Sequence, residues 1–322
     1  MPIKVFIDGG EGTTGLRLAE RLSARKDIEL LQINSALRKD EREKAAVSNA
    51  SDIVFLCLPD QAAKAAVAGI TNPQVKVIDA STAHRVLDNW AYGLPELSTL
   101  HRQKVEAAPR ICVPGCHATG FSLLVYPLVD SGLAGRDYPF TAHSVTGYSG
   151  AGKHVIANYD DKNRPEAYAI PRQYALGQSH KHLPEMQKVS RLVYPPVFNP
   201  IIADFYAGMV VTIPLHLHLL KKYQDAKELH RFFADFYADQ KLVKVQPWQA
   251  EQLLLESMLD AGSLAGRDDL EIYVCGNDER AILAARFDNL GKGASGAAIQ
   301  CMNIAHGMPE ETGLVTAADY SL

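Results

Sequence analysis

Apolar residues in the first third of the chain fall into short runs that alternate with helical patterns. The runs cover 3–7, 28–33, 52–59, 75–79 and 110–113. The third run is almost continuously apolar, which is typical of a parallel strand buried on both faces. Between the runs, apolar positions recur at the helical spacing. Strands that alternate with helices predict an α/β domain with a doubly wound, Rossmann-type parallel sheet.

The remainder of the chain has a different pattern, which predicts an α+β domain with a mixed or antiparallel sheet. Residues 210–219 alternate between apolar and polar positions, as expected of a strand with one buried face. The segments 225–238 and 249–260 are predicted helices that cover one face of this sheet. We place the first domain at 1–115 and the second at 116–293, and expect a C-terminal helix within 294–322 to pack back on the first.

Composition narrows the class of protein. A length of 322 residues fits two domains, since a domain has roughly 150 residues. The chain has 33 Lys and Arg against 37 Asp and Glu, a balance that argues against nucleic acid as a partner. No apolar stretch approaches the length of about 18 residues that a membrane span needs, and the N-terminus lacks the features of a signal peptide. Five cysteines without CxxC spacing favour a reducing cytoplasm.

The loop after the first predicted strand reads GGEGTTG and leads into a predicted helix. Gly10, Gly12 and Gly15 match the GxGxxG spacing, with Thr13 and Thr14 between the last two glycines. Glycines permit a tight turn and the close approach of a pyrophosphate, which the free N–H groups of a helix N-terminus bind. The pattern predicts a dinucleotide site that includes these five residues. An ordinary glycine turn is the alternative.

The residues after the second predicted strand favour NADP(H) over NAD. An NAD site carries an acidic residue about 20 positions after the glycines, but no acid occurs here before Asp40. Ser35 can hydrogen-bond a 2′-phosphate, and the nearby Arg38 and Lys39 can neutralise it. We therefore expect Ser35 and Arg38 to bind the cofactor. The alternative is a solvated run of mixed charge.

Cys116 follows the fifth predicted strand and begins the next helical pattern. In an open α/β sheet, ligands bind outside the carboxyl ends of the strands. A helix N-terminus also favours a negative charge, such as that of a thiolate. The position therefore predicts a nucleophilic cysteine that faces a nicotinamide. A buried cysteine at a domain junction is the alternative.

A nucleophile of this kind needs a base or a cationic partner. His180 and His182 are the candidates, and the residue pattern does not choose between them. A second pair, His216 and His218, is interpreted as the polar face of the alternating strand. We predict no metal site, because neither pair has a well-spaced third and fourth ligand nearby.

Five segments, in order along the chain, resemble motifs of the N-acetyl-gamma-glutamyl-phosphate reductase family. They read AYGLPEL (91–97), PGCHATG (114–120), TGYSGAGK (146–153), HKHLPE (180–185) and DNLGKGASGAAIQ (288–300). The glycine loop and the compact length resemble the shorter, second type of this reductase. Two positions depart from the pattern: His117 stands where many relatives have Tyr, and Lys153 where many have Arg.

The resemblance implies an NADP-dependent oxidoreductase of arginine biosynthesis, within the superfamily of acyl-phosphate reductases and semialdehyde dehydrogenases. It would convert N-acetyl-glutamyl 5-phosphate and NADPH to N-acetyl-glutamate 5-semialdehyde and inorganic phosphate. Cys116 would form a thioester with the substrate, and His182 or His180 would act as the acid and base.

The resemblance also implies further site residues and an assembly. Substrate would bind at Ser149, Gly150, Gly152 and Lys153, for which a plain glycine turn is the alternative. From their positions after predicted strands, Ser81 would line the cofactor cleft and Asn289 would lie near the nicotinamide; a helix N-cap at 292–295 is the alternative for the second segment. Related folds assemble through the sheet of the second domain, which implies a homodimer or homotetramer. The competing functions are an aspartate-semialdehyde or aminoadipyl-phosphate type of reductase, and a non-catalytic NADP sensor.

Overall fold

The chain forms two compact units. The computed structural model describes residues 2–34, 36–38, 40–222 and 225–320. The first unit comprises Met1–Gly115 and Ala294–Leu314, and the second comprises Cys116–Gly293 and Val315–Leu322. Ser35, one of the two expected ligands of a 2′-phosphate, lies outside the described residues.

The first unit is built on a parallel sheet with the strand order β2-β1-β3-β4-β6-β5. Its strands are β1 (Ile3–Asp8), β2 (Ile28–Leu31), β3 (Ile53–Leu56), β4 (Lys76–Asp79), β5 (Ala91–Tyr92) and β6 (Arg110–Cys112). Its helices are α1 (Thr13–Ser23), α2 (Glu41–Ala50), α3 (Asp60–Gly69), α4 (Thr99–Ala107) and α9 (Gly296–Ala305). All four residues of β3 are buried, as the apolar run predicted. The predicted Rossmann-type parallel sheet is confirmed.

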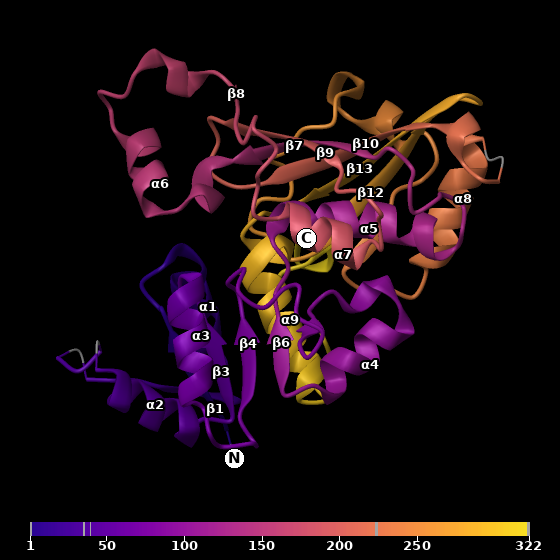
Figure 1. Ribbon diagram of the computed structural model, residues 1–322. Helices are drawn as coiled ribbons and strands as arrows, with labels where there is room; N and C mark the ends of the chain where they lie inside the picture. Colours follow the sequence, from indigo (N-terminus) through magenta and orange to yellow (C-terminus); the bar gives the residue numbers. More distant parts are fainter. Residues whose placement is uncertain (1, 35, 39, 223–224, 321–322) are drawn as a thin grey trace. The chain divides into compact units, whose positions relative to one another are not determined.

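Helix α9 joins this unit although it lies almost 200 positions after β6 in the sequence. It packs against α4 and β4 (Figure 1). The Gln300 amide donates hydrogen bonds of 2.7 Å to Glu96 and 2.8 Å to Glu310. At the end of the helix, Lys76 of β4 donates a hydrogen bond to the carbonyl of Ala305. Buried polar side chains that are paired in this way hold the helix in one position.

The second unit contains a mixed sheet with the order β11-β12-β13-β10-β7-β9-β8. The pairs β7–β9 and β11–β12 are parallel, and the other pairs are antiparallel. The strands are β7 (Thr141–Gly147), β8 (Arg172–Gln173), β9 (Val197–Ala203), β10 (Met209–His216), β11 (Val243–Val245), β12 (Leu270–Gly276) and β13 (Arg280–Phe287). The helices are α5 (Cys116–Asp130), α6 (Lys153–Asp160), α7 (Leu183–Val189) and α8 (Ala226–Phe236). The predicted class of this part, an α+β fold with a mixed sheet, is confirmed.

Helix α5 forms the centre of the second unit. It crosses β10 and β13, and α7 lies beside it (Figure 1). Residues 117–129 are all buried. Helix α5 lies close to the sheet, because a Cβ on Gly120 would stand only 2.6 Å from a methyl carbon of Val211 in β10. This packing holds the start of α5, and with it Cys116, against the sheet.

Two predictions for the second unit are wrong in detail. Residues 249–260 form short turns, Ala250–Leu253 and Leu255–Ser257, rather than a helix. Ala250 packs in a cluster with Tyr273 of β12, and Leu254 and Leu259 pack against that cluster. A chain that repeatedly returns to the sheet in this way cannot keep one helical face, and tertiary packing overrides helix propensity. Strand β10 also ends at His216, and Leu219 is 47% exposed.

Candidate active site

The glycine turn of the first unit connects β1 to α1. Gly9 has a φ of +86°, and a Cβ there would stand 2.3 Å from the carbonyl oxygen of Cys57. A Cβ on Gly15 would stand 2.4 Å from the carbonyl oxygen of Gly9. Gly12 precedes the first residue of α1, Thr13, and has no side chain with which to cap the helix. The backbone therefore leaves the helix N-terminus open to an anion.

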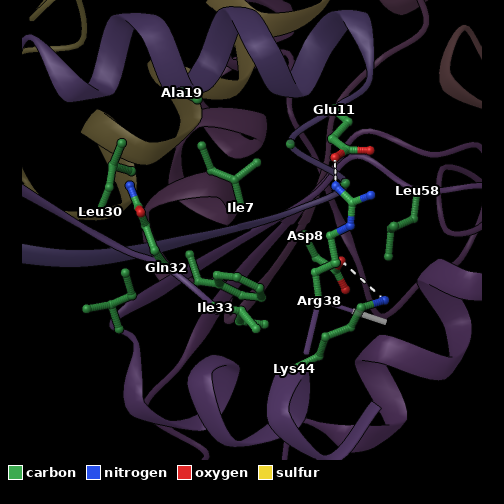
Figure 2. Close-up of a pocket in the computed structure, with 14 residues that line it drawn as sticks. Ile7, Asp8, Glu11, Ala19, Leu30, Gln32, Ile33, Arg38, Lys44 and Leu58 are labelled. Carbon is green, nitrogen blue, oxygen red and sulfur yellow. Dashed lines mark hydrogen bonds and ion pairs between the residues drawn. The ribbon is translucent and has the colours of Figure 1, made fainter. Parts of the chain in front are cut away.

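A cavity of about 540 Å³ opens beside this turn. Figure 2 shows two ion pairs at its wall, between Arg38 and Glu11 and between Lys44 and Asp8. Its lining includes Gly9, Gly10, Leu30, Gln32, Arg38 and Lys44. Of the predicted cofactor ligands, Gly10 and Arg38 lie at this cavity. Its walls combine apolar side chains of β1 and β2 with two cations, a composition suited to a nucleoside phosphate.

Asp8 and Lys44 form a pair that no motif or spacing in the sequence indicates. The Lys44 Nζ atom lies 3.6 Å from Asp8 and 3.2 Å from Glu41. Burial raises the pKa of Asp8, and Lys44 counteracts part of that rise. Burial by itself would lower the pKa of Lys44. The negative charges of Asp8 and Glu41 have the larger combined effect, and the pKa of Lys44 is raised. The pair therefore places a lysine that stays charged at the wall of the cavity.

Ser81 lies in a loop that follows β4 and is held by two aspartates. Its hydroxyl donates a hydrogen bond of 2.6 Å to Asp79, which also lies 2.5 Å from the Nδ1 atom of His84. Thr82 donates to Asp60 through both its backbone N–H and its hydroxyl. The loop is thus fixed at the carboxyl end of the parallel sheet, where ligands of such folds bind.

In the second unit, Cys116 is the first residue of α5 and is half-buried. Gly293 lies against it, since a Cβ there would stand 2.9 Å from the Cβ of Cys116. The thiol therefore lies at the positive end of the helix, where a thiolate is stabilised. This is the local geometry that the sequence predicted for a nucleophile.

Three histidines surround this position. The ring centroids of His117 and His180 are 5.4 Å apart, those of His117 and His182 are 5.5 Å apart, and those of His180 and His182 are 4.6 Å apart. A thiol sulfur of Cys116 and ring nitrogens of His117 and His182 all lie within 4.8 Å of one another. The structure thus brings Cys116 together with the predicted HKH segment, and adds His117.

Hydroxyl groups hold His117 at both ring nitrogens. Its Nδ1 atom lies 2.7 Å from the Ser144 hydroxyl, and its Nε2 atom lies 2.8 Å from the Tyr174 hydroxyl. Burial lowers the pKa of His117 to about 3, and the positive charges of His180 and Lys181 add to this effect. His117 is therefore a neutral imidazole near pH 7. Burial, and after it the charge of Cys116, raises the pKa of Tyr174.

The two candidate base residues differ in their surroundings. Burial and then Lys181 lower the pKa of His180 to about 4, and its Nδ1 atom accepts a hydrogen bond from the backbone of His182. The Nε2 atom of His182 lies 4.0 Å from the Glu185 carboxylate. A carboxylate near an imidazole stabilises its protonated form. Of the two, His182 has the environment of a proton carrier.

Ser149 and Asn289 are joined by a hydrogen bond inside the second unit. The Asn289 amide donates to the Ser149 hydroxyl at 2.9 Å, and its oxygen accepts from the N–H of Gly208 at 2.8 Å. Both side chains are buried, whereas Gly150, Gly152 and Lys153 are exposed. Because Asn289 donates, the hydroxyl proton of Ser149 is available to another acceptor.

The other cysteines have surroundings that suppress reactivity. Burial and the carboxylates of Asp79 and Asp8 raise the pKa of Cys57 to about 12. Burial and Glu251 raise the pKa of Cys275 to about 12. Cys112 and Cys301 are buried. These four thiols are therefore protonated or inaccessible near neutral pH.

Two contributors near Cys116 could not be found by sequence reasoning. Tyr174 lies in no recognised motif. Its position depends on the short strand before it, β8, which forms only by pairing with β9. His117 was noted only as a departure from a family pattern, and its contacts with Ser144 and Tyr174 join three separate segments. No spacing rule along one strand or helix connects such positions.

Each of the two units matches a known protein domain family. Residues 4–107 match the semialdehyde dehydrogenase NAD-binding domain, and residues 116–289 match the semialdehyde dehydrogenase dimerisation domain. The chain is 44% identical to N-acetyl-gamma-glutamyl-phosphate reductase 2 of Nostoc sp., over 97% of this chain and 99% of that protein. It is 42% identical to N-acetyl-gamma-glutamyl-phosphate reductase of Chelativorans sp., over 94% and 98% of the two chains.

The chain belongs to the N-acetyl-gamma-glutamyl-phosphate reductase family. The predicted membership is thereby confirmed, as are the oxidoreductase class and a nicotinamide dinucleotide as cofactor.

Solved structures show the same fold at low identity. Aspartate semialdehyde dehydrogenase II of Vibrio cholerae matches with a TM-score of 0.69 and 16% identity, over 95% of this chain and 99% of that one. A probable aspartate-semialdehyde dehydrogenase of Pseudomonas aeruginosa matches with a TM-score of 0.68 and 15% identity, over 96% of this chain and 100% of that one. This chain thus has the same fold as these solved structures. No helix among the described residues is long and apolar enough to cross a membrane.

Proposed function

We propose that this protein reduces N-acetyl-glutamyl 5-phosphate with NADPH, and so forms N-acetyl-glutamate 5-semialdehyde and phosphate in arginine biosynthesis. The observation that carries the proposal is the group formed by Cys116, His117 and His182 at the start of α5. It occurs in a chain that is 44% identical to a reductase named for this phosphate. The same group provides a nucleophile and a proton carrier for an acyl-transfer reaction.

Cys116 starts the reaction as a thiolate. Its sulfur attacks the acyl carbon of the substrate, the bond from that carbon to the phosphate oxygen breaks, and phosphate leaves with the electron pair. The product is a thioester on Cys116, which accepts hydride more readily than a carboxylate does. The N-terminal end of α5 stabilises the thiolate before attack and again when it is released.

The first unit holds NADPH in this proposal. The open N-terminus of α1 and the close approach permitted by Gly9 and Gly15 suit a pyrophosphate. Arg38 would bind the 2′-phosphate after releasing Glu11, with Lys44 as a second cation at the cavity wall. When bound, the nicotinamide supplies the hydride that reduces the thioester. Ser81 and Asn289 remain predicted cofactor contacts.

His182 is the proposed acid and base. It accepts the thiol proton of Cys116 and, with Glu185 nearby, the resulting imidazolium is stabilised. As the thioester is reduced, protonated His182 gives its proton to the former carbonyl oxygen, so that the carbon carries both the sulfur of Cys116 and a hydroxyl group. His182 removes the hydroxyl proton as the carbon–sulfur bond breaks, which releases the aldehyde and restores the thiolate. His180 is too weak a base for this role, because its pKa is lowered to about 4.

Substrate oxygens would bind at the turn between β7 and α6. The Ser149 hydroxyl retains a proton to donate, and the exposed Lys153 supplies a positive charge for a carboxylate or phosphate. Gly150 and Gly152 would contribute backbone N–H groups. We propose in addition that the protein is cytoplasmic and forms a homodimer or homotetramer through its second unit, which matches a dimerisation domain. Sedimentation equilibrium of the purified chain tests the assembly.

A kinetic comparison tests the substrate. The reverse reaction is followed as phosphate-dependent NADP reduction, with N-acetyl-glutamate 5-semialdehyde, aspartate semialdehyde and N-acetyl-aminoadipate semialdehyde. We expect the first to give the highest kcat/KM, and a preference for either of the others would overturn the assignment. Mass spectrometry of the enzyme trapped with the acyl phosphate, in the absence of NADPH, should place the acyl group on Cys116. Its presence on another cysteine would refute the mechanism.

A further inference from the structure

The second unit contains a group of side chains whose donor atoms are placed to bind a metal ion, although the proposed reaction needs no metal. The thiol sulfur of Cys116 and one ring nitrogen each of His117 and His182 lie within 4.8 Å of one another. His117 and His182 are buried, and Cys116 is half-buried. We infer that Cys116, His117 and His182 form a Zn²⁺-binding site that, when occupied, reversibly blocks the Cys116 thiol.

The donor set determines the kind of ion. One thiolate and two imidazoles suit Zn²⁺, a borderline-soft ion that takes sulfur and nitrogen ligands. Mg²⁺ and Ca²⁺ prefer oxygen ligands, and this group offers none. Three protein ligands leave a fourth position for water, which can reach the group from the exposed side of Cys116.

The geometry requires only small movements. Metal–ligand bonds of about 2.0 to 2.3 Å in tetrahedral coordination put donor atoms roughly 3.5 Å apart. The three donors must therefore approach one another by little more than about 1 Å from their present limit of 4.8 Å. A rotation of the half-buried Cys116 side chain moves its sulfur relative to the two rings, and small shifts of His117 and His182 supply the rest.

Polar groups behind the rings support the site. His117 has a hydroxyl group at each ring nitrogen, Ser144 on one side and Tyr174 on the other. Whichever nitrogen binds the metal, the other keeps a hydrogen bond that orients the ring. Glu185 lies 4.0 Å from the Nε2 atom of His182, as carboxylates often do behind a metal-bound histidine. The cost of binding is the loss of one hydroxyl contact of His117.

Binding is an exchange of one proton for one metal ion. The sulfur–hydrogen bond of Cys116 breaks, the proton passes to solvent, and the sulfur electron pair forms the bond to zinc, without oxidation or reduction. The metal-bound sulfur no longer attacks an electrophile. The resulting inhibition of turnover rests on the proposed role of Cys116 as nucleophile, but the binding itself does not.

The test uses the full chain without substrates and begins with Co²⁺ as a spectroscopic probe. We expect one equivalent to bind, with a sulfur-to-cobalt charge-transfer band that Zn²⁺ abolishes and Mg²⁺ does not. Cys116→Ser should remove the band, and His117→Gln or His182→Gln should weaken binding at least about tenfold. His216→Asn/His218→Asn alters an exposed histidine pair and should leave the band unchanged. NADPH binding and far-ultraviolet circular dichroism check that each variant is folded.

Two results would overturn the site. One is the absence of a cobalt–sulfur band in the folded wild-type chain at millimolar metal. The other is a band that survives Cys116→Ser or disappears in the exposed-pair control. Zinc should also protect Cys116 from iodoacetamide, and a chelator should restore its labelling. If zinc binds and protects Cys116 but does not inhibit the reductase assay, the metal site stands and the nucleophile assignment fails.

Discussion

Gly293 lies in direct contact with Cys116. A Cβ at Gly293 would stand 2.9 Å from the Cβ of Cys116, with the carbonyl oxygen of Asp288 at 3.2 Å and a ring carbon of Phe287 at 3.3 Å on its other sides. A methyl group has no room there unless Cys116 moves. Glycine at this position therefore permits the thiol to keep its place at the start of α5.

Gly293→Ala should displace the thiol and lower kcat at least about tenfold, since a shift of 1 Å can cost about 100-fold in rate. NADPH affinity should change little, because the cofactor cavity lies in the first unit. Gly177→Ala is the matched control, because a Cβ there would meet no atom within 4 Å. Steady-state kinetics and NADPH fluorescence titration measure the two effects. Equal kcat values for both variants would show that the contact does not position Cys116.

Iodoacetamide at pH 8 should label Cys116 first. Cys57 and Cys275 have pKa values raised to about 12, so only about one thiol in ten thousand is a thiolate at that pH. Cys57→Ser should therefore leave the labelling time course unchanged, whereas Cys116→Ser should abolish its fast phase. Peptide mass spectrometry reads out each site. Comparable rates at Cys57 and Cys116 would contradict this account.

His182→Asn and His180→Asn should separate the roles of the two histidines. We expect the first change to lower kcat by about 10² to 10⁴, the usual contribution of a general acid and base. The second should lower it less than about tenfold, because His180 has its pKa lowered to about 4 and does not carry the proton at neutral pH. Steady-state kinetics of both variants at neutral pH measure the two effects. The reverse ranking would move the base to His180.

Arg38→Gln should weaken NADPH binding by about 10- to 100-fold, the contribution of a charge-assisted contact. NADH affinity should stay the same, since NADH has no 2′-phosphate. Glu11→Gln removes the carboxylate that pairs with Arg38 and should strengthen NADPH binding. Fluorescence titration of both cofactors tests the pair of variants. A parallel loss of NADH and NADPH affinity in Arg38→Gln would indicate that Arg38 does not read the 2′-phosphate.

Acid should destabilise the chain partly through His117. An unfolded histidine takes up a proton near pH 6.5, but folded His117 resists it until about pH 3. The stabilisation is therefore complete above pH 6.5 and is lost as the pH falls from 6.5 toward 3. Between pH 6.5 and 5 the loss amounts to about 2 kcal/mol.

Urea unfolding at several pH values measures this effect. His117→Asn should be less stable at pH 7, because Ser144 and Tyr174 lose a partner, but its stability should fall less steeply toward pH 5. The exposed His218→Asn should show the wild-type slope. Equal slopes for wild type and His117→Asn would contradict the assignment of a buried neutral imidazole.

Several features of both units followed from local sequence patterns. The apolar run at β3, the glycine turn before α1 and the position of Cys116 between a strand and a helix are all properties of short segments. Periodicity reports backbone conformation and burial, and these depend mainly on neighbours in the sequence. Five co-linear motifs also identified the family, because their order records common ancestry as well as physics.

In parts of the second unit, tertiary packing produced a structure that the local sequence pattern did not predict. Residues 249–260 have a helix-like sequence but form turns, because Ala250, Leu254 and Leu259 each return to the cluster around Tyr273. The expected absence of a metal site rested on the lack of further ligands near either histidine pair in the sequence. In the folded chain, Cys116 and His117 at the start of α5 bring a sulfur and a ring nitrogen close to His182, and these two atoms are potential metal ligands.

The sequence by itself determined the fold class, the glycine turn between β1 and α1, the reductase family and Cys116 as the candidate nucleophile. Only the tertiary structure decided that His182 lies beside Cys116, that His117 is held by Ser144 and Tyr174, and that Gly293 makes room for the thiol. The physical reason is distance along the chain. The residues that meet at the start of α5 come from segments dozens of residues apart, and they come together only when α7 and the mixed sheet pack around that helix.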